Sequence, residues 1–209
     1  MTYSATRYTY HPKRALVWKE IVSYLESQFE LGDNVLDAGC GYGDFISNVK
    51  ASRRFAVDLD EEMIRHLPKD VEFKQGSIAE IDKYFPKESM DFIFSSNVLE
   101  HLSRENINHF FQAALSLLKA NGRLGIMMPN YKRAYREYYD DYTHVTPISD
   151  VALVDWLAAS GFTKVFLHPG FMPFSMKDRH ILPIILVKAW LRSPWKPGGK
   201  QMLVIVRKA

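Results

Sequence analysis

Three glycines at alternate positions, Gly39, Gly41 and Gly43, follow a short apolar segment and carry the clearest chemical signal in the chain. Glycine adopts positive φ angles without strain and has no Cβ to hold a ligand away from the backbone. The G-x-G-x-G spacing differs from the G-x-G-x-x-G that seats a dinucleotide pyrophosphate, and no Lys-Ser/Thr pair of a P-loop follows it. We therefore expect the turn to bind a nucleoside without a pyrophosphate, the alternative being a plain strand-to-helix turn of some other α/β protein.

A carboxylate at Asp58 ends the next predicted strand, where open parallel sheets bind their ligands. A carboxylate accepts two hydrogen bonds at once, which suits the paired hydroxyl groups of a ribose. The alternative is that Asp58 is a solvated acid or caps the following helix. Because Asp60 is better placed as that N-cap, we interpret Asp58 as the ribose ligand.

A histidine beside two acids marks the segment at residues 138–147. Histidine titrates near neutral pH, so it can take a proton from a hydroxyl group. We predict that His144 is a general base and that Asp141 orients it. Tyr139 and Tyr142 are predicted to form walls of a substrate pocket. The alternative is a polar surface loop.

Asp140, Asp141 and His144 also offer oxygen and nitrogen atoms of the kind that bind metal ions. One loop rarely supplies a whole metal site, and no further acidic cluster is evident in the sequence. The sequence therefore predicts no metal.

Alternating strands and helices must position these residues. The periodicity predicts strands at 34–38, 55–58, 71–75, 90–95, 123–128, 163–168 and 201–206. It predicts helices at 12–29, 44–50, 61–67, 78–85, 104–118 and 149–160. Asn121-Gly122 is expected to end the fifth of these helices. This order indicates an α/β fold with a mostly parallel sheet and helices on both faces.

The residues from Asp37 to Gly43 resemble the D/E-x-G-x-G-x-G first motif of class I S-adenosylmethionine-dependent methyltransferases. Leu99–Leu102 is similar to the "LEHL" that follows the fourth strand in many small-molecule members. Residues 118–124 resemble the family's L-K-P-G-G-R-L turn, with Ala and Asn in place of Pro and Gly. The resemblance covers about residues 30–130. It implies a Rossmann-like methyltransferase fold, with a seven-stranded sheet that ends in an antiparallel C-terminal strand.

The resemblance also implies S-adenosylmethionine as cofactor and S-adenosylhomocysteine as product. In the family, the acid at the Asp37 position lies near the amino end of the cofactor. Ser77 and Ile78 stand where the family contacts adenine, although Ser77 replaces the usual acid. The implied cofactor contacts are Asp37, Gly39, Cys40, Gly41, Gly43, Asp58, Leu59, Ser77, Ile78, Ser96 and Asn97.

His101 is a further catalytic candidate, because this strand end flanks the reactive end of the cofactor in the family. The other interpretation, a histidine bonded to backbone at a helix start, stays open. Related methyltransferases fold an N-terminal segment over the cofactor, so Tyr10 or Arg14 is a candidate for its carboxylate, with an exposed leader as the alternative. The cysteine, Cys40, is interpreted as a small structural side chain within the glycine turn.

We predict one methyltransferase domain over residues 1–209. Its parts are an N-terminal helical segment (1–30), a cofactor-binding core (30–130), a substrate loop (131–150) and a basic insertion before the last strand (169–200).

The net charge of +3 is too small to argue for nucleic acid, but its distribution is uneven. From Gly170 onward there are eight Lys and Arg residues and one acid. This region is interpreted either as a docking face for a phosphorylated, nucleotide-linked or lipid-linked acceptor, with peripheral membrane contact, or as a helix with solvated basic residues packed on the sheet edge. No signal core or spanning segment is evident, so we expect a cytoplasmic protein.

The predicted function is methyl transfer to a hydroxyl group of a small-molecule or carbohydrate-type acceptor, in carbohydrate or natural-product biosynthesis. Methyltransferases of carbohydrate pathways have a similar D-x-T-H-V segment and a similar closing strand. The alternatives are N-methylation of a small molecule and a non-catalytic cofactor-binding module. The glycine spacing disfavours an NAD-dependent oxidoreductase. A nucleic-acid substrate is not expected, because the fourth strand ends in Ser-Ser-Asn-Val rather than N/D-P-P-Y/F. Nothing in the sequence indicates an oligomeric state.

Overall fold

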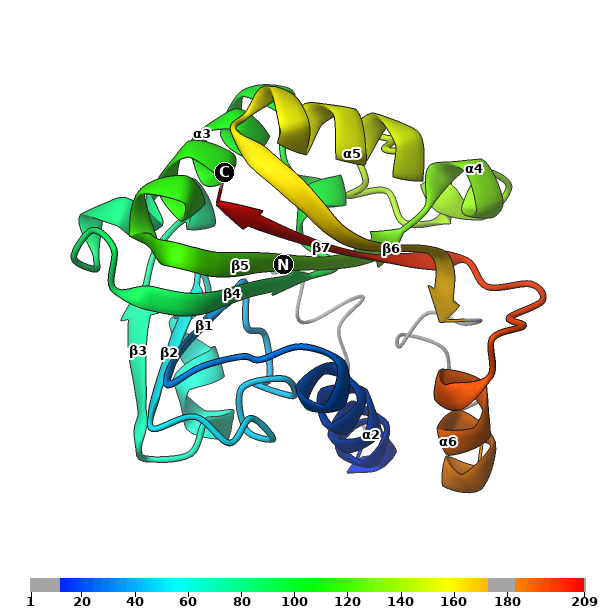
Figure 1. The fold of residues 1–209 in the computed structure, drawn as a ribbon, viewed down its shortest axis with the longest axis horizontal. Coiled ribbons are helices and arrows are strands. Elements are labelled where there is room, and N and C mark those ends of the chain that lie inside the picture. Colours follow the sequence, from blue (N-terminus) through cyan, green and yellow to red (C-terminus); the bar gives the residue numbers. More distant parts are fainter. Residues whose placement is uncertain (1–11, 173–182, 209) are drawn as a thin grey trace.

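A computed structural model describes residues 12–172 and 183–208, which form one seven-stranded sheet with helices on both faces (Figure 1). The strand order is β3-β2-β1-β4-β5-β7-β6, and only β7 runs antiparallel to its neighbours. The strands are β1 (Asn34–Ala38), β2 (Arg53–Asp58), β3 (Val71–Gln75), β4 (Met90–Ser96), β5 (Leu118–Pro129), β6 (Phe162–Met172) and β7 (Gln201–Lys208). The predicted fold class is confirmed.

Helices of two kinds connect the strands. The α-helices are α2 (Pro12–Gln28), α3 (Arg104–Leu117), α4 (Tyr131–Ala134), α5 (Asp150–Ala159) and α6 (Ile184–Arg192). Short 3₁₀ helices are η1 (Glu61–His66), η2 (Ile78–Lys83), η3 (Leu99–His101) and η4 (Tyr138–Asp140). Asp60 caps η1 as predicted, its carboxylate accepting from the Glu62 amide.

Two apolar layers sandwich the sheet, because successive side chains of its strands point to opposite faces. Ile93 of β4 joins the layer under α3, α5 and η2. Its neighbours Phe92 and Phe94 join the layer under α2 and α6. Phe45 stacks on Phe94 with ring centroids 4.2 Å apart, and Trp18 of α2 meets Phe94 edge-on at 6.2 Å. This aromatic contact anchors both the glycine turn and α2 to the sheet beside the cavity described below.

The helix predicted at 44–50 is wrong, because the chain forms a series of turns there. The side-chain amide of Asn48 donates to the Asp44 carbonyl oxygen (2.9 Å), which a helix would have given to the Asn48 backbone. That backbone amide instead donates to Phe45 (3.0 Å). The segment therefore forms tight turns instead of a regular helix.

The helix predicted at 104–118 agrees with α3 to within one residue, but Asn121-Gly122 does not end it. The helix ends at Leu117, and Leu118 already pairs with Met90 of β4. The register then shifts, so residues 119–122 form an irregular turn within β5, with Asn121 at φ 65°. Asn121-Gly122 therefore forms its turn within β5 rather than at the end of the helix.

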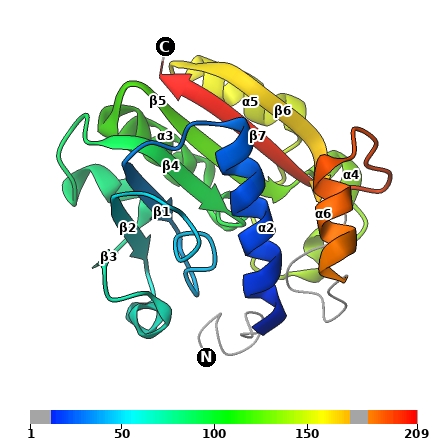
Figure 2. The ribbon, with the colours of Figure 1, turned by 60° about the horizontal axis from the view of Figure 1, so that its bottom comes forward.

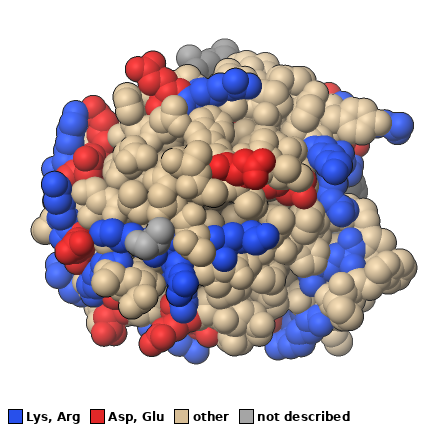
Figure 3. Space-filling model, turned by 45° about the horizontal axis from the view of Figure 1, so that its top comes forward, with Lys and Arg blue, Asp and Glu red and all other residues tan. Residues whose placement is uncertain are grey.

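The predicted insertion at 169–200 begins as a continuation of β6 to Met172, and its α6 packs beside α2 (Figure 2). Two of its basic side chains form ion pairs within the chain: Lys188 Nζ lies 3.3 Å from Glu20 and Lys200 Nζ lies 2.7 Å from Glu137. Figure 3 shows charges of both signs over the left of one face and more basic side chains over its right. No helix among residues 12–172 and 183–208 is long and apolar enough to cross a membrane.

Asn130 is fully buried and joins three segments after β5. Its Nδ2 donates to Asp150 Oδ1 (3.1 Å) and to the Pro169 carbonyl (3.0 Å). Its Oδ1 accepts from the amides of Lys132 (3.2 Å) and Asp150 (3.3 Å). These bonds fix the path by which the chain leaves the sheet for the segment at 131–150.

Replacement of Asn130 by Ala should lower the free energy of unfolding by about 1–3 kcal/mol, because it leaves buried polar groups without partners. Urea unfolding measures this loss. Asn106→Ala is the matched control, since Asn106 is exposed on α3 and only its backbone amide makes the capping bond with Ser103. Equal stability of Asn130→Ala and wild type would show that the hydrogen bonds of Asn130 do not stabilise the fold.

Candidate cofactor and acceptor site

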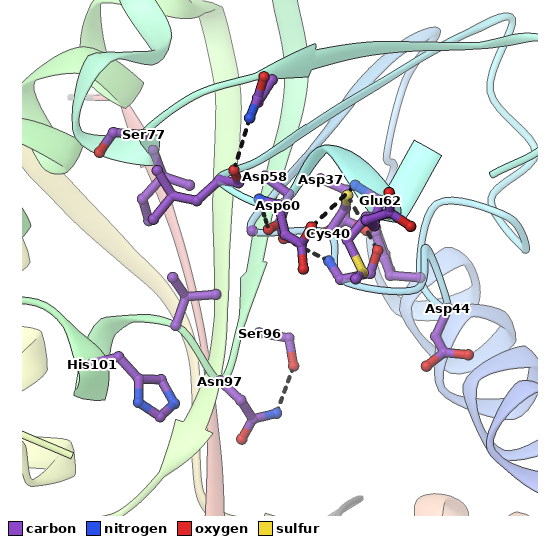
Figure 4. A pocket seen from close by; sticks show the side chains of 18 of the residues that line it. Asp37, Cys40, Asp44, Asp58, Asp60, Glu62, Ser77, Ser96, Asn97 and His101 are labelled. Carbon is purple, nitrogen blue, oxygen red and sulfur yellow. Dashed lines mark hydrogen bonds between the residues drawn. The ribbon is translucent and has the colours of Figure 1, made fainter. Parts of the chain in front are cut away.

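A cavity of about 730 Å³ lies at the carboxyl ends of β1, β2 and β4 (Figure 4). β1 has β2 on one side and β4 on the other, so the cavity lies where the strand order reverses. Open α/β sheets bind their ligands at this point. Every predicted cofactor residue except Gly43 lines it: Asp37, Gly39, Cys40, Gly41, Asp58, Leu59, Ser77, Ile78, Ser96 and Asn97.

The three glycines all have positive φ, at 81°, 50° and 70° in chain order. A Cβ on Gly39 would lie 2.4 Å from Val98 Cγ2, and one on Gly43 would lie 2.2 Å from Leu67 Cδ2. The amide of Gly39 donates to the Val57 carbonyl (2.8 Å), which holds the turn against β2. Gly39 thus shapes the cavity floor, whereas Gly43 allows close packing behind it.

Asp58 ties the end of β2 to this turn. Its Oδ2 accepts from the Gly41 amide (2.9 Å) and its Oδ1 accepts from the Asp60 amide (3.0 Å). Burial raises the pKa of Asp58, while these amides oppose the shift. Each carboxylate oxygen has a further lone pair, so the side chain can still accept hydrogen bonds from a ligand in the cavity.

Asp37 is buried, and among the described residues no group donates a hydrogen bond to its Oδ2. Burial raises its pKa well above the usual value, the Ile46 amide opposes this, and the nearby Asp58 and Asp44 raise it further. Asp44 forms an ion pair with Arg14 of α2 (2.9 Å). The excess of negative charge beside a carboxylate oxygen without a partner suits a ligand that carries positive charge.

Ser77 and Ile78 lie at one end of the cavity. The Ser77 hydroxyl accepts from the Ala79 amide (3.2 Å) and thereby caps η2. Ile78 is buried, while Leu59 is exposed at the rim. This end presents apolar surface and one hydroxyl, which suits a flat ring system.

Asn97 follows β4 with φ 54°, a conformation that asparagine tolerates better than most residues. Its Nδ2 donates to Ser96 Oγ (2.9 Å), and its Oδ1 accepts from Gln201 Nε2 (3.0 Å). The β7 side chain therefore holds the end of β4 in place at the cavity wall.

His101 and Thr143 form the wall beyond Asn97. The Thr143 hydroxyl donates to Asp141 Oδ1 (2.6 Å) and lies 2.9 Å from His101 Nδ1. His144 stands next to His101, with ring centroids 4.8 Å apart, and its Nδ1 lies 2.6 Å from the Tyr138 carbonyl oxygen. His101 is thus bonded to a backbone carbonyl, that of Thr143 at 3.2 Å, and also faces the cavity.

The predicted catalytic group is therefore brought together only in part. Asp141 and His144 adjoin His101 but do not line the cavity. Tyr139 of η4 and Tyr142 of the following turn lie at the surface, 55% and 69% exposed, and do not line it either. Sequence reasoning missed Thr143, Trp18 and Glu100, although Glu100 belongs to the "LEHL" segment that it singled out. Tyr10 lies outside the described residues.

Comparison with known proteins decides the family. A family described as "Methyltransferase domain" matches residues 10–167, most of the chain. The chain belongs to this family. S-adenosylmethionine is the cofactor of the domain, and its positive charge agrees with the acidic environment around Asp37.

Two curated relatives are phosphoethanolamine N-methyltransferases. The one from Plasmodium falciparum is 29% identical over 131 residues, which are 58% of this chain and 48% of that protein. Phosphoethanolamine N-methyltransferase 3 of Arabidopsis thaliana is 32% identical over 99 residues, 44% of this chain and 20% of that protein. The chain thus spans about half, or less, of the curated relatives that it matches.

Solved structures share the fold. A SAM-dependent methyltransferase from Archaeoglobus fulgidus superposes with a TM-score of 0.71 at 22% identity, over 99% of this chain and 97% of that one. The [4+2]-cyclase SpnF superposes with a TM-score of 0.65 at 15% identity, over 91% of this chain and 80% of that one. Because a cyclase shares the fold, the acceptor chemistry must be argued from the site.

Asp37→Asn should weaken S-adenosylmethionine binding by about tenfold to a hundredfold. The hydrogen bond expected between Asp37 and the amino group of the cofactor would lose one of its two charges. The same change should raise the Tm of the free protein at neutral pH, because it removes a buried charge. Calorimetric titration and thermal unfolding measure the two effects. Asp82→Asn, at an exposed position of η2, is the control.

The pH dependence of the Tm difference checks the cause. Folding raises the pKa of Asp37 above its ordinary 3.8, so wild type loses stability as the pH rises from about 4 towards the raised value. The Tm gain of Asp37→Asn should be absent below about pH 3 and grow above about pH 4. A gain that is equal at every pH would show that the charge of Asp37 is not its source.

Proposed function

We propose that the protein transfers a methyl group from S-adenosylmethionine to a hydroxyl group of a small-molecule, carbohydrate-type acceptor. The observation that carries this proposal is the position of His101 and Thr143, which line the cavity beyond the β4 end and lead to Asp141 and His144. A hydroxyl nucleophile needs a general base that accepts its proton.

When bound, the cofactor supplies a methyl group on a positively charged sulfonium. In the proposed arrangement, Asp37 holds its amino group and Arg14, already placed by Asp44, holds its carboxylate. Asp58 accepts hydrogen bonds from the ribose hydroxyls, and Ser77 and Ile78 contact the adenine. The excess negative charge at Asp37 and the lone pairs that Asp58 retains support these roles.

The hydrogen bonds of His101 fix its tautomer. The Thr143 hydroxyl gives its proton to Asp141, so it faces His101 as an acceptor, as does the Thr143 carbonyl. His101 Nδ1 must therefore carry a proton, and the lone pair of the neutral ring lies on Nε2. In the proposal, Nε2 takes the acceptor's proton, and the Thr143–Asp141 pair steadies the charged ring that results.

The carbohydrate class of acceptor rests on the resemblance of the Asp141–Val145 segment and the closing strand to those of carbohydrate-pathway methyltransferases. A lipid-linked form of such an acceptor agrees with the exposed Ile185, Leu186 and Trp195 near basic residues of α6. Because Lys188 and Lys200 already form ion pairs within the chain, membrane contact would depend on the remaining basic residues.

N-methylation of a small amine is the second candidate, favoured by the names of the two curated relatives. The same histidine would then take a proton from an ammonium group. A panel of sugars, nucleotide sugars, ethanolamine and phosphoethanolamine distinguishes the candidates through release of S-adenosylhomocysteine. Turnover with hydroxyl acceptors supports the proposal, turnover with amines alone replaces it by N-methylation, and none with any acceptor favours a non-catalytic module.

Thr143→Val should lower kcat by about tenfold to a hundredfold without changing cofactor affinity, because it removes the hydroxyl that orients His101. Thr143→Ser should restore most of the rate, since it keeps the hydroxyl. Thr163→Val, at an exposed position of β6, is the control. An unchanged kcat and pH profile in Thr143→Val would exclude the hydroxyl from the reaction.

A further inference from the structure

Three possible metal ligands from two separate segments lie close together: Glu100, His101 and His144. They adjoin the end of the cavity that His101 and Thr143 line, which we call the acceptor end. One ligand-type atom of each lies within 4.8 Å of those of the other two. Glu100 is fully buried, and the side chain of His144 is 8% exposed. Such a group of two imidazoles and one carboxylate is a common ligand set for divalent metal ions.

The backbone builds this cluster. The amides of Val145 (2.9 Å) and Thr146 (3.2 Å) both donate to the Glu100 carbonyl oxygen, which joins the two segments next to the side chains concerned. The Thr146 hydroxyl also donates to the Leu102 carbonyl oxygen (2.5 Å). The three side chains are therefore held close together by fixed backbone rather than by chance contact of mobile loops.

Hydrogen bonds at Nδ1 fix the tautomer of both histidines. His144 Nδ1 lies 2.6 Å from the Tyr138 carbonyl oxygen, which can only accept, so Nδ1 carries the proton. His101 Nδ1 carries a proton for the reason given above. In each neutral ring the lone pair is then on Nε2. A second nitrogen bonded to a carbonyl or hydroxyl oxygen is the usual way in which proteins orient metal-binding histidines.

The carboxylates supply charge for a cation. Asp141 Oδ2 lies 3.8 Å from His144 Nε2, so a second carboxylate stands beside the three ligands. Two carboxylates and two neutral imidazoles would together compensate the charge of one divalent ion.

We propose that Glu100, His101 and His144 bind one divalent transition-metal cation at the acceptor end of the cavity. Mixed nitrogen and oxygen ligands suit Zn²⁺, Mn²⁺ or Co²⁺ better than Mg²⁺ or Ca²⁺. Ligands about 2.1 Å from an ion in tetrahedral geometry are about 3.4 Å apart. Binding therefore requires the longest separation in the cluster, up to 4.8 Å, to shorten by up to about 1.4 Å.

The three residues leave at least one position on the ion for water or an oxygen atom of the acceptor, because His101 also lines the cavity. That role rests on the proposed methyl transfer, whereas binding of the ion does not. With the ion bound, His101 serves as a ligand, and it receives the acceptor's proton only in the metal-free protein.

Titration of chelator-treated, tag-free protein with Co²⁺ tests the site through the visible absorption of the ion. One Co²⁺ per chain should bind with bands typical of nitrogen and oxygen ligands. Glu100→Gln and His144→Asn should each weaken the affinity by more than about a hundredfold, because each removes a ligand. His109→Asn, at an exposed position of α3, should bind as wild type does.

Calorimetry with S-adenosylmethionine on the same variants shows whether they are folded. Wild type that takes up no stoichiometric Co²⁺ would overturn the site, as would undiminished binding by both Glu100→Gln and His144→Asn. Methyl transfer by a protein that takes up no Co²⁺ would remove the site and leave the proposed function. Co²⁺ uptake without methyl transfer to any acceptor would support the site and remove the proposed function.

Discussion

The carboxylate of Asp58 accepts hydrogen bonds from two backbone amides, those of Gly41 and Asp60, and so joins the ends of β1 and β2. The hydrogen bonds from Gly41 to Asp58 and from Gly39 to the Val57 carbonyl keep the glycine turn against the sheet. They hold its three glycines at positive φ angles. With the turn in place, Phe45 reaches Phe94 and the floor of the cavity is set. The position of the whole cofactor site depends on this junction.

The chemistry of the site follows from charge confined in a small volume. Asp44 and Asp58 lie close enough to Asp37 to raise its pKa, and Arg14 forms an ion pair with Asp44. Such an arrangement is unfavourable in the free protein and favourable around a cationic ligand. Next to the acceptor end of the cavity, Glu100 and Asp141 lie beside His101 and His144. Acidic side chains therefore adjoin both ends of the cavity.

The sequence predicted those parts of the fold that depend on local pattern. β1 and β3 agree with their predicted bounds, because alternating or continuous apolar runs with turn residues at each end leave few other conformations. The helix at 44–50 was wrong because a side-chain bond of Asn48 outweighs propensity. Asn121-Gly122 does not end α3, because Leu118 already pairs with β4. The cluster of Glu100 with His144 joins residues far apart in sequence, and no pattern within one loop could predict it.

A crystal structure with S-adenosylhomocysteine would test the central claim most directly, namely that the cavity at the ends of β1, β2 and β4 orients the cofactor through its acids. We expect the ribose hydroxyls within hydrogen-bonding distance of Asp58 and the amino group on Asp37 Oδ2, with the sulfur directed towards His101. A ligand with its ribose away from Asp58, or an Asp37 that contacts no part of it, would contradict this account.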